Sequence, residues 1–96
     1  MKIETVMNQN YKVLYNPHLK KDLKLLSNKE LSIFFNIIDS MLLKDPFKGK
    51  KLKGKFSELY KFRVGQYRII YKINTVEKTI YILRCRHRKN VYNNLF

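Results

Sequence analysis

The sequence has 96 residues, 45% hydrophobic and 14% aromatic, which is enough for one hydrophobic core and too little for two. No apolar run approaches a membrane span, the N-terminus lacks the apolar region of a signal peptide, and a single cysteine excludes an internal disulfide, so we expect a cytoplasmic protein. The net charge of +14 predicts a polyanionic partner: nucleic acid, an acidic membrane surface or an acidic protein.

The N-terminal part of the chain predicts a loose leader over residues 1–10, followed by a single domain over residues 11–96. "YKVLY" (residues 11–15) suits a short strand. Asn16-Pro17 then provides a helix cap and a proline at the first helical position. Leu19, Leu23 and Leu26 follow at helical spacing and predict about three turns.

A second helix begins at "SNKE", where Ser27 and Glu30 match a capping box. Its apolar residues lie on one stripe, and it is expected to end near Asp45-Pro46, because a residue before proline avoids helical geometry. Two helices with so short a connection predict an antiparallel helical hairpin.

The second half of the chain predicts strands. A basic loop, "FKGKKLKGK" (residues 47–55), precedes three β-like runs at about residues 58–64, 67–73 and 79–85. The first two runs are joined by Gly65-Gln66, which suits a type II′ hairpin turn. A two-residue turn sets the pairs Val64 with Tyr67, Arg63 with Arg68, and Phe62 with Ile69.

This register sorts the hairpin into two faces, since directly paired residues share a face and faces alternate along a strand. The core face collects Tyr60, Phe62, Val64, Tyr67, Ile69, Tyr71 and Ile73. The cationic face collects Leu59, Lys61, Arg63, Arg68, Ile70 and Lys72. Arg86 and Arg88 join the cationic face if the third run pairs beside it. Like charges directly opposite destabilise a sheet. The cluster is therefore either a solvated face with splayed side chains or a phosphate-binding site, and its arginines favour the phosphate site.

The charge distribution supports this interpretation. Residues 1–47 carry a net charge of +2, whereas residues 48–89 carry fourteen Lys or Arg and two acids, a net of +12. A lysine-rich genome would explain part of the excess, but not five arginines between residues 63 and 88. One Cys and two His without ligand spacing argue against zinc, and we expect no metal and no small-molecule cofactor.

The segments "NPHLKKDLKLLSNKE", "DPFKGKKLKGKFSELYKFRVGQYRIIYKI" and "ILRCRHRKNVY" resemble the RelE/ParE superfamily of toxins from toxin–antitoxin pairs, over about residues 11–93. The resemblance implies an α+β fold with two N-terminal helices packed on a mostly antiparallel four-stranded sheet, similar to small microbial ribonucleases. The order of the predicted elements agrees with it. The RelE-type branch implies a ribosome-dependent endoribonuclease that cuts mRNA in the ribosomal A site.

The same resemblance implies the site residues. It places Lys61, Arg63, Arg68, Arg86 and Tyr92 in the catalytic site. The best-studied branch has lysine at the Arg63 position, and arginine makes a poor general base because it rarely deprotonates.

Self-cleavage of RNA at a 2′-OH needs a base, stabilisation of the charged transition state and an acid for the leaving group. Arginines and lysines can stabilise the charged transition state without a metal. Candidates for proton transfer are Lys61, His87, Tyr92 and Glu58, with His87 and Glu58 otherwise interpreted as packing and counter-charge. Cys85, between two arginines, is either a strand-packing residue or a thiolate. The residues expected to follow the RNA backbone are Lys50, Lys51, Lys53, Lys55 and Arg88.

Three functions stay open at this stage. The first is the mRNA endonuclease, with ribosome and mRNA as partners and no membrane. The second is a ParE-type toxin that inhibits DNA gyrase, a branch that usually lacks the basic and tyrosine site residues. The third is a basic RNA-binding or DNA-binding module without catalysis. Either toxin implies an acidic antitoxin that covers the cationic face.

Overall fold

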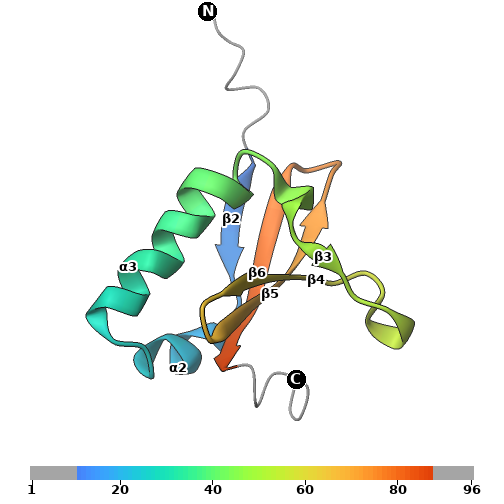
Figure 1. Ribbon diagram of the computed structural model, residues 1–96. Helices are drawn as coiled ribbons and strands as arrows, with labels where there is room; N and C mark the ends of the chain where they lie inside the picture. Colours follow the sequence, from blue (N-terminus) through green and yellow to red (C-terminus); the bar gives the residue numbers. More distant parts are fainter. Residues whose placement is uncertain (1–10, 88–96) are drawn as a thin grey trace, which may run out of the picture.

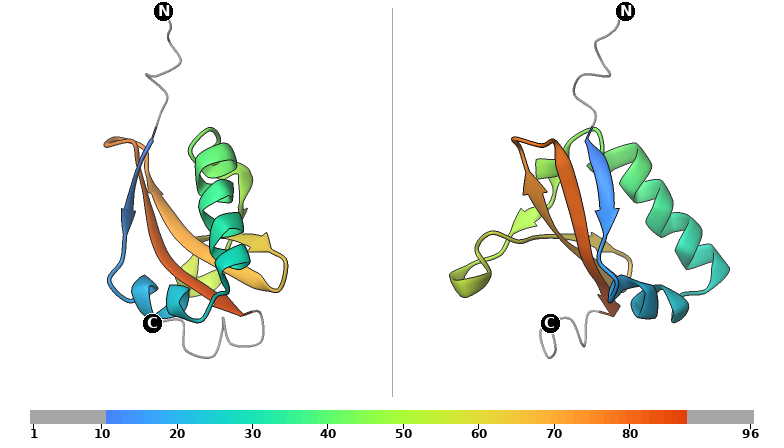
Figure 2. Two further views of the ribbon diagram at one scale, coloured as in Figure 1. Left: turned by 90° about the vertical axis from the view of Figure 1, so that its left-hand side faces the viewer. Right: turned by 180° about the vertical axis from the view of Figure 1, so that it is seen from behind.

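In the computed structural model, which describes residues 11–87, a twisted five-stranded sheet carries the longer of two helices along one face, and the shorter helix lies beside the end of the last strand (Figures 1 and 2). The strands are β2 (Lys12–Tyr15), β3 (Lys50–Lys51), β4 (Tyr60–Val64), β5 (Tyr67–Asn74) and β6 (Thr79–His87). The helices are α2 (Leu19–Lys24) and α3 (Asn28–Ile37), and the short helical turns are η1 (Ile38–Leu42), η2 (Pro46–Lys48) and η3 (Gly54–Phe56). The predicted leader, residues 1–10, lies outside the described residues. Within residues 11–87, none of the helices has the length of a membrane-spanning segment.

The sheet order is β2-β6-β5-β4-β3, with β2 parallel to β6 and every other pair antiparallel. The α+β class with a mostly antiparallel sheet is confirmed, but the strand number differs from the expected four. The fifth strand is β3, two residues of the segment that we interpreted as a basic loop. Two lysines alone do not show the alternating pattern of a strand. They pair with β4 because the preceding residue, Gly49, is fixed to the core by its hydrogen bond to Tyr71.

The two helices form where the sequence predicts them, with different lengths. The Asn16 side chain accepts the His18 amide (2.9 Å), but the helix proper starts at Leu19 and lasts six residues instead of three turns. Bonds from residue i to i−3 then carry the chain through Leu26. The Ser27–Glu30 capping box is present in both directions (3.1 and 2.8 Å). α3 ends in the π-helical turn η1 before Asp45-Pro46.

The hairpin of β4 and β5 has the predicted register. Arg63 pairs with Arg68, and Gly65 has a φ of 58°, as the first position of a type II′ turn requires. Every member of the predicted core face is buried or packs on the main core beside Phe34, Ile38 and Leu42. Figure 2 shows α3 standing along this face, so the cationic face points to the other side.

β6 is two residues longer than predicted and lies between β2 and β5. A bulge occurs opposite the step from Ile70 to Tyr71, because Ile70 pairs with Arg84 and Tyr71 with Ile82. The bulge shifts the alternation by one residue. It therefore places Ile80, Ile82 and Cys85 on the core face and turns Arg84 and Arg86 to the cationic face.

Tyr71 connects the core to β3. Its side chain is fully buried, and its hydroxyl donates to the Pro46 carbonyl (2.7 Å) and accepts from the Gly49 amide (3.1 Å). Burial raises the pKa of Tyr71 to about 12. A side chain at Gly49 would collide with this hydroxyl and would lie 2.7 Å from the Lys61 carbonyl, so glycine is required there.

We expect Tyr71→Phe to lower the free energy of unfolding by about 1–3 kcal/mol, because two buried backbone groups lose their partner. Urea unfolding measures the change. Tyr60→Phe is the matched control, since Tyr60 stacks on Tyr71 (5.6 Å) but is only half-buried, and it should cost less. An equal loss in both variants would contradict this role for the Tyr71 hydroxyl.

Candidate functional site

Three arginines form a row across three adjacent strands on the cationic face. Arg63 on β4 pairs with Arg68 on β5, and Arg68 pairs with Arg86 on β6. Neighbouring strands lie about 4.8 Å apart, so this arginine row spans roughly 10 Å. Arg63 is exposed, whereas Arg68 and Arg86 are half-buried. The predicted cluster of Arg63, Arg68 and Arg86 is thus assembled by strand pairing, and its guanidinium groups suit phosphate oxygens.

A second row runs beside the first, about 7 Å along the strands. Lys50 on β3 pairs with Lys61, and Lys61 pairs with Ile70, which in turn pairs with Arg84. A hollow of about 410 Å³ opens where the two rows meet the sheet edge. Its cationic lining residues are Lys48, Lys50, Lys61 and Arg63. Sequence reasoning did not single out Lys48, which η2 brings to this hollow.

The cationic face is not charged throughout. Leu59, Ile70 and Leu83 form a second buried cluster on it, against which Leu52 and Phe56 pack. The segment containing η3 therefore folds over part of the face and leaves Lys53 and Lys55 exposed. This second core separates the arginine row and the edge hollow from Lys72, so the cations do not form the one continuous cluster over the face that the alternation predicts.

Asp22 is a site residue that sequence reasoning missed. It is 4% exposed, and its carboxylate accepts from Arg84 at Nε (2.8 Å) and Nη2 (2.9 Å). The Arg86 Nε lies 3.9 Å from the same carboxylate. Two arginines therefore have a local counter-charge. The signal was present in the sequence, because Asp22 falls on the apolar stripe of Leu19, Leu23 and Leu26.

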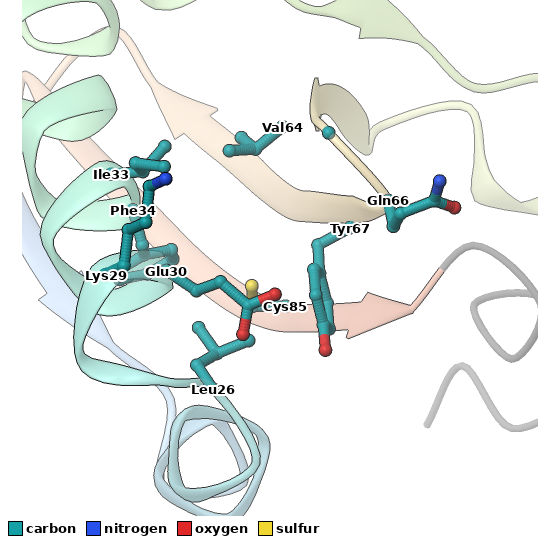
Figure 3. A pocket seen from close by; sticks show the side chains of 10 residues that line it. Leu26, Lys29, Glu30, Ile33, Phe34, Val64, Gln66, Tyr67 and Cys85 are labelled. Atoms are coloured by element: carbon teal, nitrogen blue, oxygen red, sulfur yellow. The ribbon is translucent and has the colours of Figure 1, made fainter.

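Cys85 lies on the opposite side of the sheet from the arginine row. Figure 3 shows its sulfur in an apolar groove between α3 and the hairpin, beside Leu26, Phe34 and Tyr67. Burial, together with the carboxylates of Asp22 and Glu30, raises the pKa of Cys85 to about 12. Cys85 is 3% exposed in the main core, on the face opposite Arg84 and Arg86, so the strand-packing interpretation is confirmed.

This pKa predicts a loss of stability in alkali. A thiol that ionises near pH 9 when unfolded and near pH 12 when folded stabilises the protein fully below pH 9, and that stabilisation disappears as pH rises towards 12. Urea unfolding should show a decline of up to about 1.4 kcal/mol per pH unit from this group. Cys85→Ala should reduce the steepness above pH 9, with Tyr71 still contributing above pH 10. An unchanged pH profile in Cys85→Ala would refute this account of alkaline instability.

The remaining predicted residues are placed as follows. Glu58 is exposed and lines a different hollow together with Lys72 and Tyr81, away from the arginine row. Lys51 pairs with Tyr60 at the sheet edge. His87 closes β6 opposite Tyr67, and only its backbone is described. Arg88 and Tyr92 lie outside the described residues. Among residues 11–87, no cluster of three metal-ligating side chains occurs.

A family model described as the ParE toxin of the type II toxin–antitoxin system parDE matches residues 13–92. Two curated toxins are similar to the chain over most of their length. Toxin RelG of Mycobacterium tuberculosis is 29% identical, covering 85% of this chain and 95% of RelG. Putative toxin RelE1 of Methanocaldococcus jannaschii is 30% identical, covering 88% of this chain and 97% of RelE1.

Solved structures give the same result. The chain is similar to a chain of the Mycobacterium tuberculosis toxin–antitoxin complex RelBE2, with a TM-score of 0.77, 29% identity and coverage of 82% of this chain and 99% of that chain. A chain of the RelB–RelE antitoxin–toxin complex from Methanococcus jannaschii has a TM-score of 0.60 at 32% identity, covering 83% and 95%. The isolated Escherichia coli RelE toxin shares the fold, with a TM-score of 0.67 at 15% identity, covering 80% and 83%.

Proposed function

Since the chain belongs to the ParE toxin family of type II toxin–antitoxin systems, within the RelE/ParE superfamily, we propose that this toxin is a ribosome-dependent endoribonuclease that cleaves mRNA. The observation that carries the proposal is the arginine row of Arg63, Arg68 and Arg86. It supplies three planar cations within about 10 Å, the scale of one phosphodiester and its neighbours. The reaction would take place in the cytoplasm.

In this reaction the 2′-oxygen of the RNA attacks the adjacent phosphorus and the bond from phosphorus to the 5′-oxygen breaks. The products are a 2′,3′-cyclic phosphate and a 5′-hydroxyl. Negative charge grows on the non-bridging oxygens in the transition state, where fixed cations give the largest stabilisation. Arg68 has the central place, because it is flanked by Arg63 on one strand and by Arg86 on the other. The arginine row thus provides charge stabilisation without requiring a metal ion.

Proton transfer falls to other groups. Lys61 is half-buried and lies one same-face step from Arg63, within reach of the same phosphate, which suits a base for the 2′-OH. His87 and Tyr92 are the other candidates, for the base or for the acid that protonates the 5′-oxygen. Arg63 acts as a phosphate contact instead of a base, because a guanidinium does not release its proton near neutral pH.

The lysines at the sheet edge would guide the RNA. Lys48 and Lys50 line the hollow beside the arginine row, and Lys53 and Lys55 are exposed on the segment that follows. We assign Lys50, Lys51, Lys53 and Lys55, with Arg88, to backbone contacts with mRNA or ribosomal RNA. Such contacts weaken with salt and carry little sequence preference.

An antitoxin is the expected protein partner. The RelBE2 and RelB–RelE structures are complexes of a toxin with its antitoxin. The arginine row and the edge lysines would attract an acidic antitoxin segment that orders on binding and covers the site. We therefore expect a small acidic protein that is produced together with this toxin.

Inhibition of DNA gyrase is the second candidate, favoured by the match to the ParE family model. Two assays with purified toxin separate the candidates. In the first, ribosomes that carry a defined mRNA should yield A-site cuts. In the second, gyrase should keep its supercoiling activity at the same toxin concentration. Strong inhibition of gyrase without mRNA cuts would reverse the order of the two candidates, and binding of RNA with neither effect would indicate a module without catalysis.

A further inference from the structure

Asp22 lies at the edge of the sheet, where the pairing of β2 with β6 has ended and β6 continues. β2 pairs with β6 only from Thr79 to Ile82, and Asn16 makes the last backbone bond on that side, to the Ile82 carbonyl (2.9 Å). Figure 1 shows α2 beside the following part of β6, below the end of β2. α2 thus takes the position where a longer β2 would continue, and it brings a carboxylate to the strand edge.

The carboxylate of Asp22 is anchored to the backbone of β6. Its Oδ2 accepts from the Cys85 amide (2.9 Å), a group that points away from β5 towards the edge. The same oxygen accepts from Arg84 Nε, and Oδ1 accepts from Arg84 Nη2, which makes a bidentate pair. Three hydrogen bonds to a side chain that is 4% exposed fix the orientation of the carboxylate.

Arg86 forms a second, longer ion pair with the carboxylate of Asp22. Its side chain is 18% exposed, and its Nε lies 3.9 Å from Oδ1 of Asp22. At that distance the contact is an ion pair and not a hydrogen bond. Because Arg86 pairs with Arg68 on β5, the arginine row ends at Asp22 on its β6 side.

From this geometry we infer that Asp22 is a positioning residue: it holds the ε side of Arg86 so that the Nη groups face the phosphate bound at Arg68. Arg84 serves as the clamp that holds Asp22. The carboxylate also offsets charge at the β6 end of the arginine row, so the strongest positive field lies at Arg68 and Arg63. The inference rests on the proposed function for its role in cleavage, whereas the orientation of Arg86 can be tested independently.

The test uses Asp22→Asn, which keeps the size of the side chain but removes the charge, together with Arg86→Lys and the double variant. Asp39→Asn on the exposed surface of η1 is the matched control. Single-turnover cleavage of mRNA on programmed ribosomes is measured well below the unfolding temperature, with the folded fraction of each variant determined by circular dichroism. A second readout is the NMR order parameter of the Arg86 Nε–Hε group.

We expect Asp22→Asn to lower the maximal cleavage rate by about 10-fold. The ribosome concentration that gives half of the maximal rate should change by less than about two-fold. In the Arg86→Lys background, Asp22→Asn should lower the rate little further. The Arg86 order parameter should fall to that of the exposed Arg63. An equal loss in both backgrounds, or an unchanged Arg86 order parameter, would overturn the inference. A wild-type protein that cuts no mRNA would instead overturn the proposed function, and the order parameter alone would then decide whether Asp22 orients Arg86.

Discussion

Replacing Arg68 or Arg86 by alanine is expected to lower A-site mRNA cleavage by at least about 100-fold and to abolish growth inhibition. Each substitution removes a fixed cation from the place where transition-state charge develops, and removal of one such group typically costs about 10²–10³ in rate. The loss should fall mainly on the maximal rate, since the edge lysines still bind RNA. Single-turnover kinetics on programmed ribosomes measures it.

The matched control is Lys72→Ala, which removes an exposed cation from the same face but outside the arginine row. It should retain cleavage within about three-fold, because an exposed charge this far away is screened by salt. Thermal unfolding shows whether each variant is folded. Folded Arg68→Ala and Arg86→Ala proteins that cleave at the wild-type rate would show that the site is assigned to the wrong residues.

The largest effect on stability is expected from Asp22→Ala. This change removes the acceptor of three hydrogen bonds and leaves the Arg84 guanidinium, 14% exposed, without its carboxylate. Breaking a buried ion pair by removal of one partner costs about 3–5 kcal/mol, a large share of the roughly 5–15 kcal/mol that stabilises a typical domain. We expect urea unfolding to show a loss in this range.

Asp39→Ala provides the comparison, since Asp39 is an exposed acid and its removal should change stability by less than about 0.5 kcal/mol. The loss of stability in Asp22→Asn should lie between those of Asp22→Ala and Asp39→Ala, because an amide oxygen can still accept from the Cys85 amide. A loss below about 1 kcal/mol for Asp22→Ala would mean that water replaces the carboxylate, and that Asp22 does not fix the β6 edge.

The sequence predicts the hairpin register well because two independent signals agree there. Glycine marks the turn, apolar residues alternate with cations, and the resulting Arg63–Arg68 pair is the one observed. The capping box of the second helix is similarly local, since it depends on two residues three positions apart. Local chemistry of this kind can be predicted because no tertiary contact competes with it.

The parts that sequence reasoning missed depend on long-range contacts. β3 forms because Tyr71 holds Gly49, 22 residues away in sequence. The bulge that turns Arg84 and Arg86 to the cationic face leaves no clear pattern in "YILRCRH". Asp22 is hydrogen-bonded to Arg84, which is 62 residues away in the sequence. The only sequence signal for its burial is its position on an apolar stripe. The bulge and the Asp22–Arg84 pair both shape the site. The arginines of the row were therefore predicted, but the carboxylate that balances their charge was not.

Sequencing the 5′ ends of cellular mRNA after brief induction of the toxin tests the central claim most directly. If the arginine row cleaves mRNA on the ribosome, new 5′-hydroxyl ends should appear within translated reading frames, in register with codons, and they should be lost in Arg68→Ala. Growth arrest with no new mRNA ends, or with ends that ignore the reading frame and persist in Arg68→Ala, would contradict it.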